Sequence, residues 1–296
     1  MDHQADPEDI LLDSLQSLYD YVPITYSSAG SVFQYSLTEM HRSLQALHGA
    51  DGETSLQTSN ITLVTPTTDA SNWSLHASSI WASSLFLADH LDDLHLDQHI
   101  LAARHRGQDR LRVLELGTGA GLPSILIARC FTEVDMVASD YPDIELTRTL
   151  RTNVEKNGVA KRCRVVPYAW GSDSSVFRKG GDRLDSGDWQ MDVIVAADTL
   201  WNPELHALFL QTLRILLRRT ADARIYLVAG LHTGRYTLQA FMKAVENFGF
   251  SLESVGERAV SGHETRLWDV NRAEGEEDKE RRRWVIWMII KWQNIP

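Results

Sequence analysis

The chain is poor in cysteine and carries no excess of positive charge. Its 296 residues include only two cysteines, Cys130 and Cys163, which excludes a disulfide scaffold. We interpret them as two buried thiols in a reducing compartment, rather than as a disulfide or a metal-binding pair. The net charge of −11, without a stripe of lysine or arginine, argues against a nonspecific grip on nucleic-acid phosphates. The sequence therefore predicts no metal site and no nucleic-acid partner.

Long apolar runs are absent as well. No segment approaches the length that crosses a bilayer, and the acidic residues 1–9 resemble neither a secretory signal nor a transit peptide. Hydrophobic residues make up 43% and charged residues 23% of a chain long enough for a well-buried core. We expect a cytoplasmic protein that has no membrane partner, and the oligomeric state is left open.

The most informative segment is an apolar run followed by a glycine-rich turn. Residues 113–116 are typical of a buried strand, and a helix with Pro123 in its first turn follows. Between them, three glycines let the backbone turn tightly: Gly117, Gly119 and Gly121. A helix N-terminus after such a turn presents unpaired N–H groups to a ligand. Alone, this pattern would also suit a dinucleotide oxidoreductase or a turn without a ligand.

A carboxylate downstream makes the glycine pattern more specific. The predicted strand 134–139 ends at Asp140, about twenty residues past the glycines, where a βαβ nucleotide site places its ribose-binding acid. Together, the glycines and the acid predict a nucleoside site. The alternative is that Asp140 caps the helix that starts near Asp143.

Strand and helix patterns alternate from residue 111 onward. Strands are predicted at 111–116, 134–139, 163–168, 191–197 and 223–230, and helices near 122–131, 143–157, 204–219 and 237–249. This order predicts an α/β fold, a parallel sheet with helices on both faces. Two further strands, 251–258 and 284–292, have no helix between them, so they should pair antiparallel or lie apart. Between them lies the charged segment, residues 272–283, with five acids and five bases, which we expect to be a solvated loop.

The residues before the glycine turn suggest an N-terminal cap. Residues 10–19 have the spacing of an amphipathic helix, residues 60–64 are a short β-like run, and residues 80–91 look helical again. We interpret residues 1–105 as a helical cap with a short β segment, packed on a ligand-binding domain of residues 106–296.

Chemistry should concentrate at one edge of this sheet. In an open parallel sheet, ligands bind at the carboxyl ends of the strands. The residues that follow the first four strands include glycines, acids and aromatics: Gly117, Thr118, Gly119, Gly121, Asp140, Tyr141, Trp170, Ala197, Asp198 and Trp201.

Several of these blocks resemble one enzyme family. Residues 115–121, with an acid just before the first glycine, look like the first motif of class I S-adenosylmethionine-dependent methyltransferases. Residues 139–143 and 150–154 resemble the seven-β-strand lysine-methyltransferase group, in particular its fungal branch once labelled nicotinamide N-methyltransferase-like and linked to elongation-factor methylation. The resemblance covers residues 73–292 and implies a Rossmann-like sheet of seven strands, mostly parallel with an antiparallel last strand.

The resemblance implies S-adenosylmethionine as cofactor and gives roles to the site residues. Asp140 suits the ribose hydroxyls, and Trp170 suits the adenine ring unless it is a core tryptophan. Glu115 either lies near the sulfonium or holds the glycine turn by hydrogen bonds to its backbone. The remaining residues expected to bind the cofactor are Trp81, Gly117, Thr118, Gly119, Gly121, Tyr141 and Ala197.

Asp198 and Trp201 are the candidate catalytic residues. Asp198 would orient an acceptor nitrogen or draw away its proton, although it could instead cap the next helix. Since the sulfonium is already an excellent leaving group, no covalent intermediate and no catalytic triad are expected. His206, His232 and His263 are possible bases, but a lone histidine is more often structural or exposed.

The acceptor side departs from the family's pattern. Trp81 keeps the tryptophan of a His-Pro-Leu-Trp-Gly block, but its neighbours differ, and residues 198–203 replace the Asp-x-x-Tyr or Asp-Leu-Ile-Phe-Asn-His of relatives. We favour N-methylation of a small molecule, such as a natural product, in a pocket walled by Trp73, Trp81 and Trp201. One alternative is a protein N-methyltransferase acting on a lysine or N-terminal amine, for instance of a translation factor, with the negative charge attracting a basic partner. Another is a scaffold that binds the cofactor without transferring a methyl group.

Overall fold

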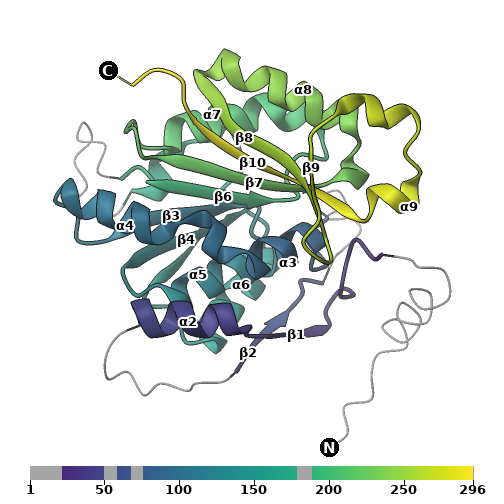
Figure 1. Ribbon diagram of the computed structural model, residues 1–296. Helices are drawn as coiled ribbons and strands as arrows, with labels where there is room; N and C mark the ends of the chain where they lie inside the picture. The colour runs from purple at the N-terminus through teal and green to yellow at the C-terminus, as the bar shows by residue number, and fades with distance from the viewer. Residues whose placement is uncertain (1–21, 50–58, 68–75, 179–188, 296) are drawn as a thin grey trace, which may run out of the picture.

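The computed structural model describes residues 22–49, 59–67, 76–178 and 189–295, and within them an eight-stranded sheet forms the centre of the molecule (Figure 1). The strand order is β5-β4-β3-β6-β7-β10-β8-β9. Five strands run parallel: β3 (Leu111–Leu116), β4 (Val134–Asp140), β5 (Cys163–Pro167), β6 (Val193–Ala197) and β7 (Arg224–Gly230). All five confirm strands predicted from the sequence.

The last strand of the chain runs against its neighbours. β10 (Trp284–Trp292) lies antiparallel between β7 and β8 (Phe250–Ala259). This confirms the predicted antiparallel pairing of the two strands that have no helix between them. A short edge strand, β9 (Thr265–Leu267), pairs with β8 and adds an eighth strand to the seven expected.

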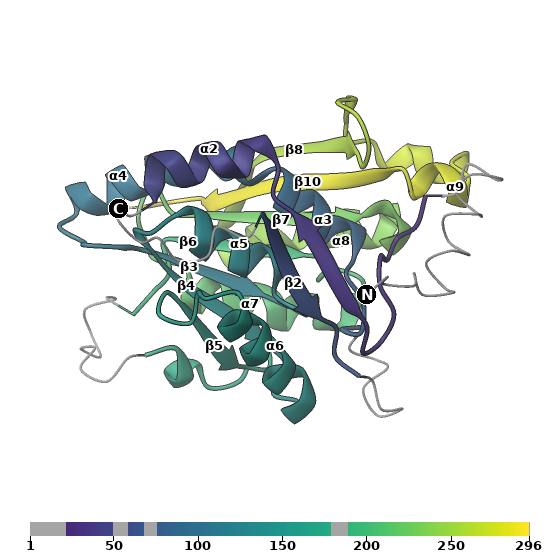
Figure 2. The same ribbon diagram turned by 90° about the horizontal axis from the view of Figure 1, so that it is seen from below.

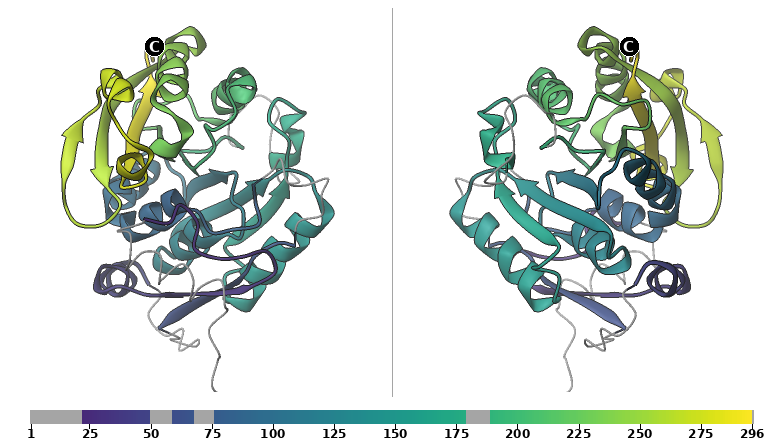
Figure 3. Two further views of the ribbon diagram at one scale, coloured as in Figure 1. Left: turned by 90° about the vertical axis from the view of Figure 1, so that its right-hand side faces the viewer. Right: turned by 90° about the vertical axis from the view of Figure 1, so that its left-hand side faces the viewer.

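Helices cover both faces of the sheet, as predicted. On one face lie α7 (His206–Leu216), which follows the short 3-10 helix η4 (Pro203–Leu205), and α8 (Arg235–Val245). On the other lie α3 (Ala82–Asp89), α4 (Leu96–His105), α5 (Leu122–Cys130) and α6 (Ile144–Lys156), with α2 (Glu39–His48) packed outside α5 (Figures 1 and 3). α5 is apolar all round because α2 and α3 cover the side that faces away from the sheet.

The described N-terminal residues share a hydrophobic core with the sheet. β1 (Val32–Ser36) and β2 (Asn60–Val64) form a separate antiparallel pair outside α5 and α6 (Figure 2). The Asn153 amide on α6 binds both backbone groups of Val64, at 2.9 and 2.8 Å. The β-like run at residues 60–64 is therefore a strand. The predicted helix at 10–19 lies outside the described residues, and a domain boundary at residue 105 remains a prediction.

The charged segment differs from the solvated loop that was expected. It contains part of a 3-10 helix, η7 (Val270–Glu274), and a short helix, α9 (Asp278–Arg281). The Glu276 side chain is only 6% exposed, because it pairs with the fully buried Arg235. The expectation of a solvated loop is therefore wrong for Glu276.

Two smaller expectations can be compared with the described residues. Cys130 and Cys163 are both buried free thiols. Among the helices of the described residues, none is long and apolar enough to cross a membrane.

Candidate functional site

A cavity of about 580 Å³ lies at the carboxyl ends of β3, β4 and β6. We call it the strand-end cavity. Its lining comes from residues 76–84, from the glycine turn after β3, and from the segments that follow β4, β5, β6 and β7. This is the edge of the sheet that the sequence predicts as the ligand site.

The glycine turn opens onto this cavity. Gly117 has a φ of +70°, and a Cβ on it would lie 2.7 Å from the Thr199 methyl group. Only glycine fits there without strain. Gly119, at φ +57°, has no atom within 4 Å of where its Cβ would stand, so its backbone is open to a ligand.

Asp140 clamps the glycine turn and faces the cavity. Its carboxylate accepts a 2.6 Å hydrogen bond from the Gly119 N–H and a 2.7 Å bond from the Tyr141 N–H. A carboxylate has about four acceptor positions, so positions remain for ribose hydroxyls. Asp140 is not the cap of the next helix, because Asp143 stands at the N-cap of α6 and accepts a 2.8 Å hydrogen bond from the Leu146 N–H. Burial raises the pKa of Asp140, against the two backbone hydrogen bonds that lower it.

Removal of the Asp140 carboxylate is expected to weaken cofactor binding. Because a hydrogen bond to a charged group contributes about 1.5–3 kcal/mol, Asp140→Ala should raise the Kd of S-adenosylhomocysteine roughly 10- to 100-fold. Isothermal titration calorimetry measures this directly. The matched control is Asp97→Ala, on the exposed side of α4 away from the cavity. An Asp140→Ala protein with unchanged Kd would show that this carboxylate does not bind the cofactor.

Glu115 lies behind the turn rather than in the cavity. Its side chain is 1% exposed and is not part of the cavity lining. It accepts a 3.0 Å hydrogen bond from the Ser124 N–H, as well as one from the Ser124 hydroxyl. This geometry corresponds to the turn-holding alternative, because the carboxyl group satisfies an N–H group in the first turn of α5. Contact between Glu115 and the sulfonium remains a prediction without support from this arrangement.

Glu115 should make stability depend on pH. Burial raises its pKa from 4.5 to about 8, more than the Ser124 hydrogen bonds lower it. The folded protein therefore holds this proton more tightly than the unfolded chain, and stability should fall as pH rises from about 5 to 8, by at most about 1.4 kcal/mol per unit. Glu115→Gln mimics the protonated form. In urea titrations at several pH values, the unfolding free energy of Glu115→Gln minus that of the wild type should increase as the pH rises from about 5 to 8. A difference that stays constant with pH would contradict the assignment.

The other residues expected to bind the cofactor are placed along the cavity. Trp170 lines it and packs on Phe209, with ring centroids 4.6 Å apart, so it is both a wall and part of the core edge. Tyr141 stands at the rim, half-exposed. Six more predicted residues also line the cavity: Trp81, Gly117, Thr118, Gly119, Gly121 and Ala197.

Asp198 marks the end of the cavity beyond β6. Its backbone is left-handed, with φ +52°. One oxygen, Oδ1, accepts a 2.8 Å hydrogen bond from the Gly230 N–H, whereas Oδ2 is buried and has no partner among the described residues. Asp198 does not cap the next helix, since Asn202 accepts from the Glu204 N–H at η4. A buried, unpartnered carboxylate oxygen is costly unless a ligand completes it.

Aromatic rings line the same cavity as this carboxylate. The Trp81 ring stacks on the imidazole of His232 at 5.5 Å and 17°, and its Nε1–H donates to the His76 carbonyl at 2.7 Å. The His76 ring meets the edge of Trp201 at 4.7 Å. No pattern in the sequence pointed to His76, and His232 was only one of three histidines considered as bases. Trp73 lies outside the described residues.

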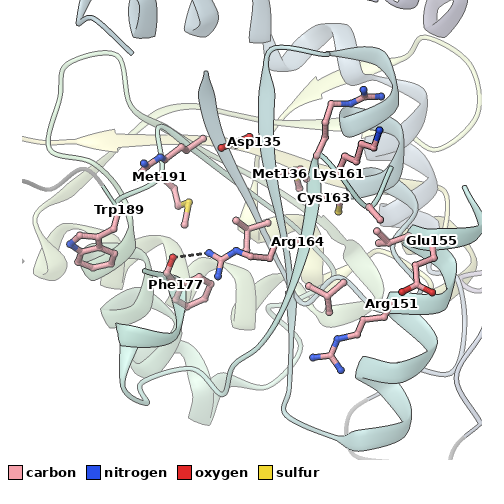
Figure 4. Close-up of a pocket in the computed structure, with 16 residues that line it drawn as sticks. Asp135, Met136, Arg151, Glu155, Lys161, Cys163, Arg164, Phe177, Trp189 and Met191 are labelled. Atoms are coloured by element: carbon pink, nitrogen blue, oxygen red, sulfur yellow. Dashed lines mark hydrogen bonds between the residues drawn. The ribbon is translucent and has the colours of Figure 1, made fainter. Parts of the chain in front are cut away.

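A second cavity of about 420 Å³ lies elsewhere, beside β4, β5 and α6 (Figure 4). It is lined at the amino-terminal parts of the strands and contains no glycine turn. Its basic side chains include Arg164, which donates to the Phe177 carbonyl at 2.7 Å and so ties β5 to the loop that follows it (Figure 4). Its position and partners indicate a structural role for these residues.

Curated relatives of the chain are protein methyltransferases. Several carry the name protein N-terminal and lysine N-methyltransferase, and three of them serve as examples. The one from Schizosaccharomyces pombe is 27% identical over 62% of this chain and 68% of its own length. The one from Gibberella zeae is 28% identical over 50% of this chain and 60% of its own length. The one from Eremothecium gossypii is 32% identical over 49% of this chain and 52% of its own length. The chain thus spans between half and about two thirds of these relatives.

Solved structures include a distant match. The mitomycin 7-O-methyltransferase MmcR is 15% identical with a TM-score of 0.41, covering 62% of this chain and 49% of that one.

The family itself follows from a broader comparison. Residues 66–248, more than half of the chain, match the family model described as lysine methyltransferase. The matched region contains the glycine turn, Asp140, Trp170 and Asp198, which line the strand-end cavity. The open turn, the remaining acceptor positions of Asp140 and the aromatic wall fit the nucleoside of S-adenosylmethionine. The chain belongs to the lysine methyltransferase family, and it is an enzyme that uses S-adenosylmethionine as its methyl donor.

Proposed function

We propose that this protein methylates an amine of another protein, on a lysine side chain or at an N-terminus. The observation that carries the proposal is the buried, unpartnered Oδ2 of Asp198 at the aromatic end of the strand-end cavity. The relatives named above act on such amines. They favour the protein acceptor over the small molecule preferred from the sequence, so the order of these two hypotheses is reversed. A scaffold without methyl transfer has no support from a family of enzymes.

The chemistry of this corner suits an amine. An amine or ammonium nitrogen donates hydrogen bonds, which is what an unpartnered carboxylate oxygen lacks. Aromatic faces attract a cation within about 6 Å of the ring centre, and Trp81 and Trp201 line the same cavity as the carboxylate. A carbon acceptor would give the Asp198 carboxylate no hydrogen bond, and a neutral hydroxyl would give it a hydrogen bond but no opposite charge, whereas an ammonium supplies both.

Different residues along the cavity bind the cofactor and orient the acceptor. In this proposal, Asp140 holds the ribose hydroxyls and Trp170 covers the adenine ring. When bound, the cofactor supplies a methyl group on a sulfonium sulfur, which leaves as a neutral sulfide. Asp198 orients the acceptor nitrogen, and the aromatic rings of the cavity exclude water from it. Positioning and exclusion of water are the main contributions expected from the protein.

The identity of the acceptor can be tested with labelled cofactor. Purified protein and methyl-labelled S-adenosylmethionine are incubated with an extract of cells that lack the gene, because acceptor sites there are unmethylated. We expect label in protein bands, and mass spectrometry of their peptides then separates lysine from N-terminal methylation. Asp198→Asn protein serves as the matched control. Label confined to the small-molecule fraction would refute the proposal and restore the small-molecule hypothesis.

A further inference from the structure

The three histidines that the sequence offered as bases have very different surroundings. The Nε2 atom of the buried His206 lies 2.9 Å from the Leu200 carbonyl and is committed to it. His263 is exposed, in the turn between β8 and β9, and does not line the cavity. His232 alone of the three lines the strand-end cavity, with a side chain that is 17% exposed.

The position of the His232 ring is well defined. It lies flat against Trp81, and its Nε2 is 4.0 Å from Oδ1 of Asp198. Gly230, at the end of β7, leaves the space that the ring occupies, because a Cβ there would lie 2.2 Å from the imidazole Nδ1. Gly230 has φ −68° and ψ 142°, which any residue adopts. Glycine is therefore required at this position to leave room for the His232 ring, and not by the backbone conformation.

Two acidic side chains interact with the His232 ring. Asp198 approaches it from the loop after β6. From α9, Asp278 interacts with it: the Asp278 pKa is lowered mainly by the Arg282 hydrogen bond and, less strongly, by the charges of Arg281 and His232. On α8, Arg235 is paired with Glu257 and Glu276. His76 is a further titratable residue of the cavity lining.

An amine must lose a proton before it can attack a methyl group. A lysine amine has a pKa of about 10.4 and a protein N-terminus about 8, so both are largely protonated at neutral pH. The nitrogen lone pair is then unavailable. A base within the cavity removes this obstacle, and such a base typically contributes about 100- to 10,000-fold in rate.

We propose that His232 accepts the proton that the acceptor ammonium loses, with Asp198 stabilising the resulting imidazolium. The proposal rests on the proposed methylation of an amine. The ammonium N–H bond breaks and the proton moves to the imidazole. The freed lone pair forms the new N–C bond, while the C–S bond breaks and its electron pair stays on sulfur. The imidazolium then returns its proton to solvent.

Two variants and one control test this role. His232→Gln removes the base, and Gly230→Ala keeps His232 in the chain but displaces its ring. His263→Gln is the matched control, outside the cavity. For each protein, kcat is measured from pH 6.5 to 10 with the unmethylated form of the acceptor protein identified by labelling, or with its peptide, and the Kd of S-adenosylhomocysteine is measured by calorimetry.

We expect both cavity variants to lose about 100-fold in kcat at pH 7, with Kd within threefold of the wild type. The loss should shrink toward pH 10 for a lysine acceptor and toward pH 8–9 for an N-terminal one, because the amine is then neutral without help. A loss of equal size at every pH, or wild-type activity of His232→Gln, would overturn the role of His232 alone. A wild-type enzyme that methylates no amine at all would overturn the proposed function together with it.

Discussion

Asp198→Asn is expected to lower kcat by about 100-fold or more while leaving the Kd of S-adenosylhomocysteine within about threefold. The change removes the negative charge at Oδ2 and places an amide where the acceptor nitrogen needs an acceptor. Asparagine tolerates the left-handed conformation at φ +52° and keeps an oxygen for the Gly230 N–H. The backbone and the cofactor end of the cavity should therefore be unchanged.

Kinetics and calorimetry together check this expectation. Single-turnover rates at saturating acceptor report the methyl-transfer step, and calorimetry with S-adenosylhomocysteine reports the cofactor end. Asp97→Asn, on exposed α4, is the matched control and should behave as wild type. If Asp198→Asn raised KM for the acceptor without changing kcat, Asp198 would bind the acceptor equally in the ground and transition states. Unchanged kinetics would refute any role for it.

The sheet could be predicted closely because its strands carry their own pattern. β3 and β10 have the same bounds in the structure as in the prediction, 111–116 and 284–292. Both consist mostly of apolar residues, a pattern set by burial on both faces. The role of Asp140 could also be predicted from the sequence, because its position depends only on the length of one βαβ unit.

The acceptor end depended on contacts that no local pattern encodes. His76 and His232 are far apart in sequence, and they come together on the two sides of Trp81 only after α3 has packed on β6 and β7. For a related reason, the sequence alone could not decide between the two roles considered for Glu115. Its position before the glycines is visible in the sequence, but the direction of its side chain, toward Ser124 and away from the cavity, depends on how α5 meets β3.

The burial of Glu276 in the charged segment could not be predicted from the sequence either, for an electrostatic reason. Composition predicts solvation for a segment rich in acids and bases, because isolated charges avoid the interior. Glu276 is buried because its partners come from outside the run: Arg235 begins α8, and Arg266 lies on β9. A buried acid of this kind cannot be recognised until the cation that neutralises it is placed.

Arg235 forms the centre of a buried ion cluster. Its guanidinium donates to both oxygens of Glu257, at 2.6 and 2.8 Å, and to both oxygens of Glu276, at 2.7 and 2.8 Å. It also lies over the Trp268 ring, 5.1 Å from the centroid. Burial alone would lower the Arg235 pKa and raise those of the two acids, but their mutual hydrogen bonds prevail, raising the first and lowering the others. The cluster joins α8 and β8 to the charged segment.

Arg235→Ala is therefore expected to destabilise the protein by about 3–5 kcal/mol, because two buried carboxylates would keep only their more exposed arginine partners. Urea unfolding measures this, and the matched control is Arg148→Ala, whose pair with Glu145 is exposed and should contribute less than about 1 kcal/mol. Trypsin should also cut faster after Arg281 and Arg282, since the charged segment loses its anchor. A destabilisation no larger than that of Arg148→Ala would mean that Glu257 and Glu276 remain satisfied without Arg235, and that the anchoring of α9 lies elsewhere.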